Sequence, residues 1–306
     1  MIPILDWSTY QSDPDSFTAA LGKACRDTGF FLLKGHGVDP TLIDGVFSKA
    51  DAFFALPQAE KAPLSISNNP HNRGWASEGS ENLDDTAEGH DRKEAFNVGF
   101  DLAADDPRVL AGEPFRGVNV WPKDPAFRDT MLAYYSAVHG LSVDLHHAIA
   151  RDLGLDEDYF APHFTAPLAT LRVLRYPEAR DAAPGELGAG AHSDYGSVTL
   201  LMTDGEAGLE VRPRGGDWTP VPHVEGAYVV NIGDCLMRWS NDIYVSTPHR
   251  VQRPKRVRRS IAFFLDPNPE SVIQALPGTG APKYQPITGA DYLRSRLDAT
   301  YKAPTP

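Results

Sequence analysis

Residues 191–213 read AHSDYGSVTLLMTDGEAGLEVRP: two short, apolar, β-prone runs separated by glycines. Short β-prone runs at such close spacing, divided by Gly and Pro, predict a sandwich or barrel of antiparallel strands. Six more runs of the same kind lie between Pro167 and Asp266: ATLRVLRYP, WTPVP, AYVVNIG, CLMRWS, HRVQ and SIAFFLD.

Helical patterns flank this β-rich part. Short strands are predicted at IPILDW and GFFLLKG, and helices over residues 13–28, 40–55, 125–153 and 289–301. Residues 65–122 are polar and rich in glycine, and irregular segments of this length tend to be lids or substrate-binding loops. We therefore predict one domain over 1–306, mainly β with flanking α. Its N-terminal α/β region with an irregular lid segment spans 1–120, and a long helix, the β core and a C-terminal helix span 121–306.

Composition narrows the classes of function. The formal net charge is −12, and RPKRVRR is the one basic run, so the chain does not suit nucleic acid or anionic lipid. Cys25 and Cys235 are predicted to be reduced core thiols, which excludes a Cys-based zinc site. No stretch approaches the roughly 18 apolar residues of a membrane span, and MIPILDWSTY does not match a signal peptide. We expect a cytoplasmic monomer without membrane or nucleic-acid partners.

One His-x-Asp pair is a candidate half of a metal site. Residues two apart on a strand share a face and lie roughly 6.6 Å apart, so His192 and Asp194 could converge on one ion while Ser193 faces away. The spacing alone is weak, because His223-Val224-Glu225 has it too. The first pair is favoured because it lies between a Gly-rich approach, PGELGAG, and a strand, whereas His223 lies in a predicted turn.

A third ligand should come from another strand, and His249 in STPHRVQ is the best candidate. Two imidazoles and one carboxylate form the facial triad of non-haem Fe(II) oxygenases, although a zinc hydrolase could use the same set. Beyond it, Arg258 and Ser260 share one face of a predicted strand. A guanidinium beside a hydroxyl can bind a carboxylate through two parallel hydrogen bonds.

These segments together resemble the isopenicillin N synthase-like family of Fe(II)- and 2-oxoglutarate-dependent dioxygenases. The resemblance covers nearly the whole chain and implies a double-stranded β-helix, or jelly-roll, core. It also implies that His192, Asp194 and His249 bind iron, and that Arg258, Ser260 and Tyr176 bind the co-substrate. The matching segments, in the family's order, are IPILDWS, DTGFFLLKGHGVD, FFALPQAEK, LRVLRYP, AHSDYGSVTLLMTDGEAGLEV, WTPVP, AYVVNIGD and STPHRV with RRSIAFF.

The family's chemistry implies three cofactors or co-substrates: Fe(II), 2-oxoglutarate and O2. Oxidative decarboxylation of 2-oxoglutarate to succinate and CO2 would be coupled to hydroxylation or another oxidation of a small polar molecule. Isopenicillin N synthase itself has the Arg-x-Ser pair but takes no 2-oxoglutarate. An iron oxidase without that co-substrate, and a non-catalytic β-barrel that senses a small acid, are therefore the alternatives.

The substrate side of the site is predicted from residue type and position. Aromatic candidates have an alternative as core residues, because large rings dominate buried area. The arginines have an alternative as surface ion-pair partners. The candidates are Arg73, Trp75, Phe96, Arg172, Tyr195 and Phe264.

Overall fold

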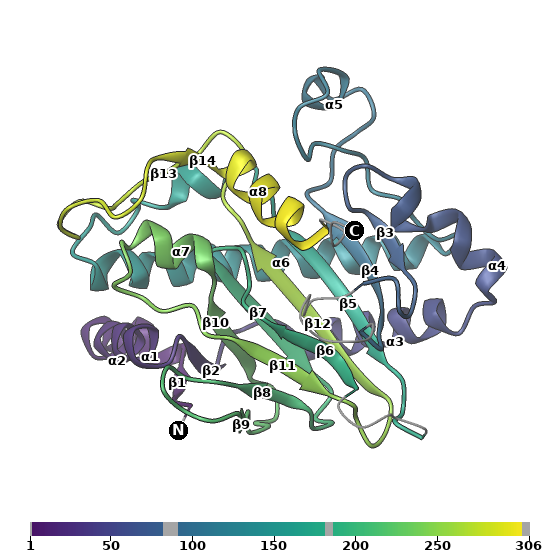
Figure 1. Cartoon of the computed structure of the whole chain (residues 1–306), viewed down its shortest axis with the longest axis horizontal. Helices are drawn as coiled ribbons and strands as arrows, with labels where there is room; N and C mark the ends of the chain where they lie inside the picture. The colour runs from purple at the N-terminus through teal and green to yellow at the C-terminus, as the bar shows by residue number, and fades with distance from the viewer. Residues whose placement is uncertain (1, 82–90, 181–185, 302–306) are drawn as a thin grey trace, which may run out of the picture.

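The computed structural model describes residues 2–81, 91–180 and 186–301, and its centre is a pair of facing sheets (Figure 1). The larger sheet has the order β1-β2-β10-β7-β12-β5-β4-β3 and is antiparallel except for the β1-β2 pair. Its strands are β1 (Ile4–Asp6), β2 (Phe30–Lys34), β3 (Gly74–Ala76), β4 (Glu94–Gly99), β5 (Thr170–Tyr176), β7 (Val198–Thr203), β10 (Tyr228–Ile232) and β12 (Arg258–Leu265).

The smaller antiparallel sheet has the order β6-β11-β8-β9 and completes the predicted jelly-roll core. Its strands are β6 (Leu187–His192), β8 (Leu209–Val211), β9 (Thr219–Pro220) and β11 (His249–Gln252). A separate hairpin pairs β13 (Val272–Ile273) with β14 (Ile287–Thr288).

Asp-Pro dipeptides begin four of the helices. Asp13, Asp39, Asp106 and Asp124 each accept a hydrogen bond from a backbone N–H of the first turn, and proline follows each of them. The proline has no N–H to leave unpaired there, and its fixed φ suits the first helical position. These helices are α2 (Pro14–Asp27), α3 (Pro40–Phe54), α5 (Pro107–Leu110) and α6 (Pro125–Asp152).

The remaining helices are shorter or lie at the end of the described chain. They are α1 (Ser8–Ser12), α4 (Gln58–Lys61), α7 (Asp234–Trp239) and α8 (Gly289–Tyr301), with the 3-10 turns η1 (Ala62–Leu64), η2 (Ile66–Asn68) and η3 (Ala161–Phe164). Among the described residues, no helix combines the length and the apolar character needed to cross a membrane.

The two faces of the large sheet have different partners. Helices α3 and α6 pack on one face, behind the strands in Figure 1, while the small sheet covers the other. Strand residues alternate between these faces. On β12, Ile261 and Phe263 join the helix-side core, whereas Arg258, Ser260 and Ala262 face the space between the sheets. The alternation therefore divides each strand into a structural face and a cavity face.

The structure corrects three details of the sequence prediction. CLMRWS is not a strand but helix α7, because Cys235, Leu236 and Trp239 recur at helical spacing and are buried together. The segment 65–122 is only partly irregular, since β3 and β4 within it extend the large sheet. The described end of the Gly-rich approach, from Leu187, belongs to strand β6, which ends at His192, so Asp194 lies just beyond the strand end.

Candidate active site

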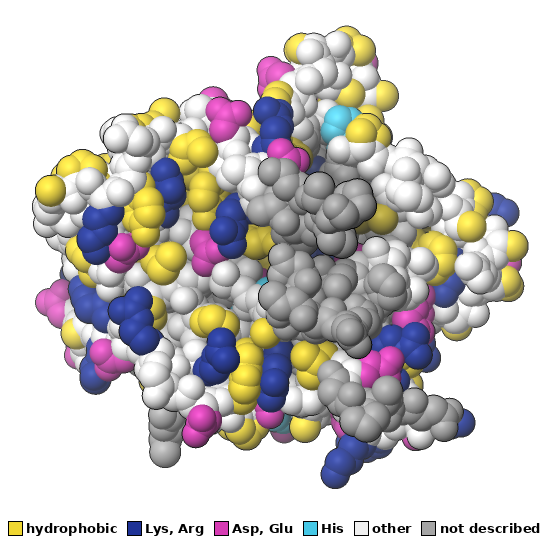
Figure 2. All heavy atoms as spheres, viewed as in Figure 1, with side chains coloured by type: hydrophobic (Ala, Val, Ile, Leu, Met, Phe, Trp, Pro, Cys, Tyr) yellow, Lys and Arg dark blue, Asp and Glu magenta, His cyan; other side chains and the backbone are white. Residues whose placement is uncertain are grey.

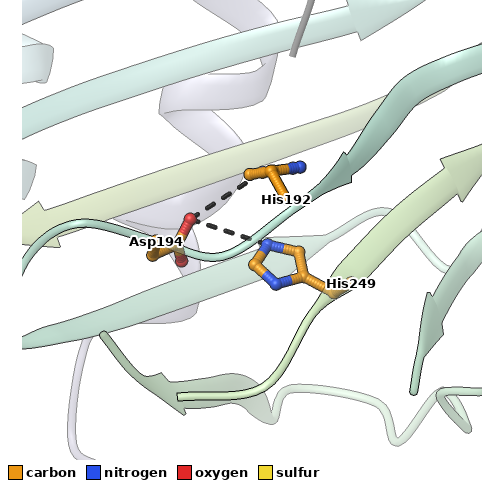
Figure 3. Close-up of side chains that lie close together, drawn as sticks. All are labelled: His192, Asp194 and His249. Atoms are coloured by element: carbon orange, nitrogen blue, oxygen red, sulfur yellow. Dashed lines mark ion pairs between the residues drawn. The ribbon is translucent and has the colours of Figure 1, made fainter. Parts of the chain in front are cut away.

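His192, Asp194 and His249 come together at one end of the space between the sheets (Figure 3). His192 is the last residue of β6 and is paired directly with His249, the first residue of β11. The Oδ1 atom of Asp194 lies 3.8 Å from Nε2 of His192 and 3.6 Å from Nε2 of His249. One ligand atom from each residue lies within 4.8 Å of the others, which is compact enough for all three to reach one ion.

Hydrogen bonds orient the side chains of these candidate metal ligands. Nδ1 of His192 lies 2.7 Å from the Gly190 carbonyl, and Nδ1 of His249 lies 3.3 Å from the Thr247 carbonyl. A carbonyl accepts only from a protonated nitrogen, so both rings carry the proton on Nδ1 and present the Nε2 lone pair.

The carboxylate of Asp194 is fixed in the same way. Its Oδ2 atom accepts hydrogen bonds from Oγ1 of Thr199 at 2.6 Å and from Nδ2 of Asn231 at 2.8 Å. Oδ1 is left to face the two imidazoles. Thr199 and Asn231 lie on the neighbouring strands β7 and β10, so the large sheet orients a ligand that stands between the sheets.

The local electrostatics keep His192 and Asp194 in the protonation states that bind metal. Burial and the neighbouring His249 ring lower the pKa of His192 to about 4. Burial opposes ionisation of Asp194, but the two imidazoles and the hydrogen bonds from Thr199 and Asn231 outweigh it and lower its pKa. Neutral imidazole and ionised carboxylate are the metal-binding forms. The donor set therefore fits a divalent ion such as Fe(II).

A buried cation without a carboxylate partner lies in the same cavity. Arg258 is 1% exposed, and none of the described residues forms an ion pair with it. Its Nη1 atom lies 3.4 Å from Oγ of Ser260, and its guanidinium stands 5.0 Å from the centre of the Tyr176 ring. Arg258 and Tyr176 are also register partners across β12 and β5. The three residues predicted to bind the co-substrate are thus adjacent.

The cavity has a volume of about 220 Å³ and opens between the sheets beside the triad. Four of the predicted substrate residues line it: Arg73, Arg172, Tyr195 and Phe264. Arg172 is paired with Glu81, which also lies 3.6 Å from Nζ of Lys93. The ring of Tyr195 stands 4.8 Å from the guanidinium of Arg296, on helix α8.

Trp75 and Phe96 lie elsewhere, and the substrate role predicted for them is corrected. They are register partners on β3 and β4, with side chains on the helix side of the sheet. Phe96 is fully buried against Phe53 and Phe127, and the Trp75 indole donates to Glu94. On β4 the cavity face belongs instead to Asn97 and the preceding Lys93.

Several cavity residues escaped the sequence prediction. Counting in steps of two along a strand, which keeps to one face, would have led from Lys93 to Asn97 and from Arg172 to Thr170 and Leu174. No local pattern marks a further group of cavity residues, because its members come from loops or from helix α8, whose approach to the sheets is a tertiary feature. This group includes His71, Phe115, Leu168, Leu293 and Leu297.

A jelly-roll core that brings two histidines and one aspartate to the mouth of a cavity defines the class of non-haem iron oxygenases. Comparisons with known proteins agree. Residues 2–124 match the family described as "non-haem dioxygenase in morphine synthesis N-terminal", and residues 168–267 match the "2OG-Fe(II) oxygenase superfamily".

Individual relatives cover almost the whole chain. The chain is 36% identical to the 2-oxoglutarate-Fe(II) type oxidoreductase hxnY of Emericella nidulans, over 98% of this chain and 90% of that protein. A putative 2OG-Fe(II) oxygenase family protein from Caulobacter crescentus is 32% identical, with a TM-score of 0.87 over 97% of this chain and 98% of that one. A full-length Neurospora crassa protein, solved in complex with alpha-KG, is 32% identical, with a TM-score of 0.86 over 98% of this chain and 96% of that one.

The chain belongs to the 2OG-Fe(II) oxygenase superfamily, in its isopenicillin N synthase-like branch. It is a 2-oxoglutarate-dependent dioxygenase that uses Fe(II), 2-oxoglutarate and O2 and acts on a small molecule. The resemblance, the jelly-roll fold and the reaction class predicted from the sequence are thereby confirmed.

Proposed function

We propose that His192, Asp194 and His249 hold the Fe(II) of this dioxygenase. The observation that supports the assignment is the direction of the lone pairs. Both Nδ1–H groups are occupied by backbone carbonyls, and Oδ2 of Asp194 by two donors, so one atom of each residue is left for a common ion.

We further propose that Arg258, Ser260 and Tyr176 bind the distal carboxylate of 2-oxoglutarate. A buried guanidinium without a counter-ion is costly, and a bidentate carboxylate would offset that cost. The Ser260 hydroxyl adds a third donor, and the Tyr176 ring supports the guanidinium plane.

When bound, iron with 2-oxoglutarate and O2 supplies the chemistry: oxidative decarboxylation to succinate and CO2, coupled to hydroxylation or another oxidation of the substrate. The protein positions the reacting groups and excludes water from them. Helix α8 contributes Leu293 and Leu297 to the cavity wall, which limits the access of water to the reacting centre. Asn231 and Thr199 hold Asp194 in one orientation throughout.

The substrate is proposed to be a small polar molecule, and the protein to act as a cytoplasmic monomer without nucleic-acid or membrane partners. The net charge of −12 supports the lack of nucleic acid, and on the face in Figure 2 the Lys and Arg side chains are scattered among acidic ones. Cys25 and Cys235 are both buried free thiols, as suits a reducing compartment.

We also propose that residues 1–306 work as a single oxygenase domain. Strand β2, from the N-terminal region, is hydrogen-bonded to β10 of the jelly roll, and β4 is hydrogen-bonded to β5. Residues predicted to belong to the N-terminal region thus form part of the main sheet and of the cavity wall.

The test measures Fe(II) binding and O2-dependent succinate formation in the wild type and in His192→Ala and Asp194→Ala. Both variants are expected to lose iron binding and succinate formation. His223→Ala is the matched control, because it removes an exposed histidine of the other His-x-acid pair. Undiminished succinate formation in either triad variant contradicts the iron assignment. An iron-loaded wild type that binds no 2-oxoglutarate favours the substrate-only oxidase, and one that binds it tightly without turnover favours the sensor.

A further inference from the structure

A second buried guanidinium, that of Arg73, lies in the same cavity and is not used by the function proposed above. Arg73 is 6% exposed, and among the described residues no hydrogen bond or ion pair reaches it. Burial lowers its pKa to about 10, which still leaves it charged at neutral pH. An uncompensated buried charge is destabilising, so its retention in a binding cavity points to a ligand of opposite charge.

The backbone around Arg73 is shaped to place it there. Asn72 and Gly74, its two neighbours, have φ values of 59° and 101°. A Cβ on Gly74 would lie 2.2 Å from the Leu64 carbonyl oxygen, so only glycine fits. Farther along, a Cβ on Gly99 would lie 1.7 Å from Cζ of Arg73. The guanidinium therefore lies flat on a glycine of β4, in a position that both glycines create.

The nearby acids do not neutralise Arg73. Asp101 is paired with Arg128 at 2.8 Å and also accepts from Asn119. Glu81 is shared by Arg172 and Lys93. The other close charge, Arg116, is a cation: it donates to the Ala166 carbonyl and pairs with no described carboxylate. This end of the cavity is therefore electropositive.

Part of the cavity wall is apolar. Its apolar side chains include Phe115, Leu168, Phe264, Leu293 and Leu297. Phe115 has a φ of 60°, an unusual conformation for a bulky residue, of the kind that persists where function requires it. A ligand held by Arg73 would thus place its charge against a guanidinium and its body against hydrocarbon.

We propose that Arg73 binds the carboxylate of the substrate, so that the molecule oxidised is a small monocarboxylic acid with an apolar body. The proposal rests on the function proposed above and narrows its substrate from a small polar molecule to an organic acid. The cavity of about 220 Å³ would then hold the distal carboxylate of 2-oxoglutarate on Arg258 and the carboxylate of the substrate on Arg73, with the reacting carbon between Arg73 and the triad.

The first test needs no substrate. The melting temperature of the ligand-free protein is measured for the wild type, for Arg73→Met and for the control Arg212→Met, which removes an exposed surface arginine. Arg73→Met removes an uncompensated charge and keeps the length of the side chain, so we expect a melting temperature higher by about 2 °C or more. A melting temperature lower than that of the wild type overturns the proposal, because Arg73 would then have a structural partner.

The second test offers pairs of small carboxylic acids and their neutral primary amides and measures succinate released from 2-oxoglutarate. At least one acid is expected to stimulate the wild type while its amide does not. Arg73→Met should lose about 10²- to 10³-fold in kcat/KM for that acid, and Arg73→Lys less, because lysine keeps the charge without the bidentate fork. Gly99→Ala keeps the arginine but displaces its guanidinium, and should show a similar loss.

The outcomes separate this proposal from the one on which it rests. A wild type that forms succinate but responds to no acid, or to amides equally well, overturns the role of Arg73 alone. An intact acid response in Arg73→Met does the same. A wild type that neither binds 2-oxoglutarate nor forms succinate with any compound instead overturns the proposed function.

Discussion

Replacing Arg258 with methionine should weaken 2-oxoglutarate binding about 10²- to 10³-fold. The guanidinium is 1% exposed and can donate two parallel charge-assisted hydrogen bonds to the distal carboxylate. Such bonds contribute about 1.5–3 kcal/mol each, and we take about 3–4 kcal/mol for the pair. At about 1.4 kcal/mol for each tenfold change, that range corresponds to the predicted loss.

The assay combines steady-state and equilibrium measurements. Initial rates of succinate formation give the KM for 2-oxoglutarate, and an anaerobic titration of the Fe(II)-loaded protein gives its dissociation constant directly. Both are needed, because KM equals the dissociation constant only when chemistry is slower than dissociation. Ser260→Ala, which removes one neutral donor, should shift the dissociation constant only about fivefold.

Arg259 is the matched control. It follows Arg258 on the same strand, but its side chain points to the other face and pairs with Asp204 at 3.0 Å and with Asp51 at 2.6 Å. Arg259→Met should therefore leave 2-oxoglutarate binding within about twofold, since the Arg259 side chain does not line the cavity. A shift smaller than threefold in a folded Arg258→Met protein, or equal shifts in both variants, would refute the assignment of the co-substrate carboxylate to Arg258.

Three other perturbations probe the metal site, a buried histidine and the core. Asn231→Leu removes a donor that orients Asp194 and should weaken Fe(II) binding about 10- to 100-fold in a metal titration. Burial lowers the pKa of His146 to about 4, below the 6.5 of an exposed histidine. Its neutral form therefore stabilises the fold above pH 6.5, and up to about 3 kcal/mol of the unfolding free energy is lost as the pH falls towards 4. Urea unfolding at several pH values should show a smaller loss in His146→Gln than in the wild type. Phe96→Ala should lower the unfolding free energy by about 3–5 kcal/mol in the same assay, because it leaves a cavity on the helix side of the sheet.

Each of these predictions has an outcome that contradicts it. Unchanged metal affinity in Asn231→Leu would mean that Thr199 alone orients the carboxylate. Parallel losses of stability on acidification, with and without His146, would mean that other groups dominate acid unfolding. A Phe96→Ala protein that is as stable as the wild type but has an altered KM for its substrate would return this ring to the binding site.

Much of the fold could be predicted because local signals agree with it. Asp-Pro dipeptides mark helix starts, and period-two alternation separates Ile261 and Phe263 from Arg258 and Ser260. The errors have physical causes as well. Cys235, Leu236 and Trp239 suit a strand by residue type, and only their burial on one helical face distinguishes the two structures.

The residues of the candidate site also differ in whether a local sequence pattern identifies them. His192, Asp194 and Arg258 lie within continuous segments whose pattern could be interpreted, and the structure places all three beside one cavity, although Asp194 lies just beyond the strand on which it was predicted. Phe96 was misplaced because its strand is buried on both faces, and residue type then says nothing about which face a side chain takes. Leu293 could not be predicted at all, since it depends on where helix α8 packs.

The charged side chains that line the cavity indicate what kind of ligands it holds. Of the three arginines that line it, Arg172 is balanced by Glu81, whereas Arg73 and Arg258 pair with no carboxylate among the described residues. A protein of net charge −12 has many acids with which it could have balanced both. Because unpaired buried cations destabilise a fold, two of them in one cavity indicate two anionic groups in the reacting complex. The distal carboxylate of 2-oxoglutarate, proposed to bind Arg258, would account for one of these groups, and the second is the reason to search for the substrate among carboxylic acids.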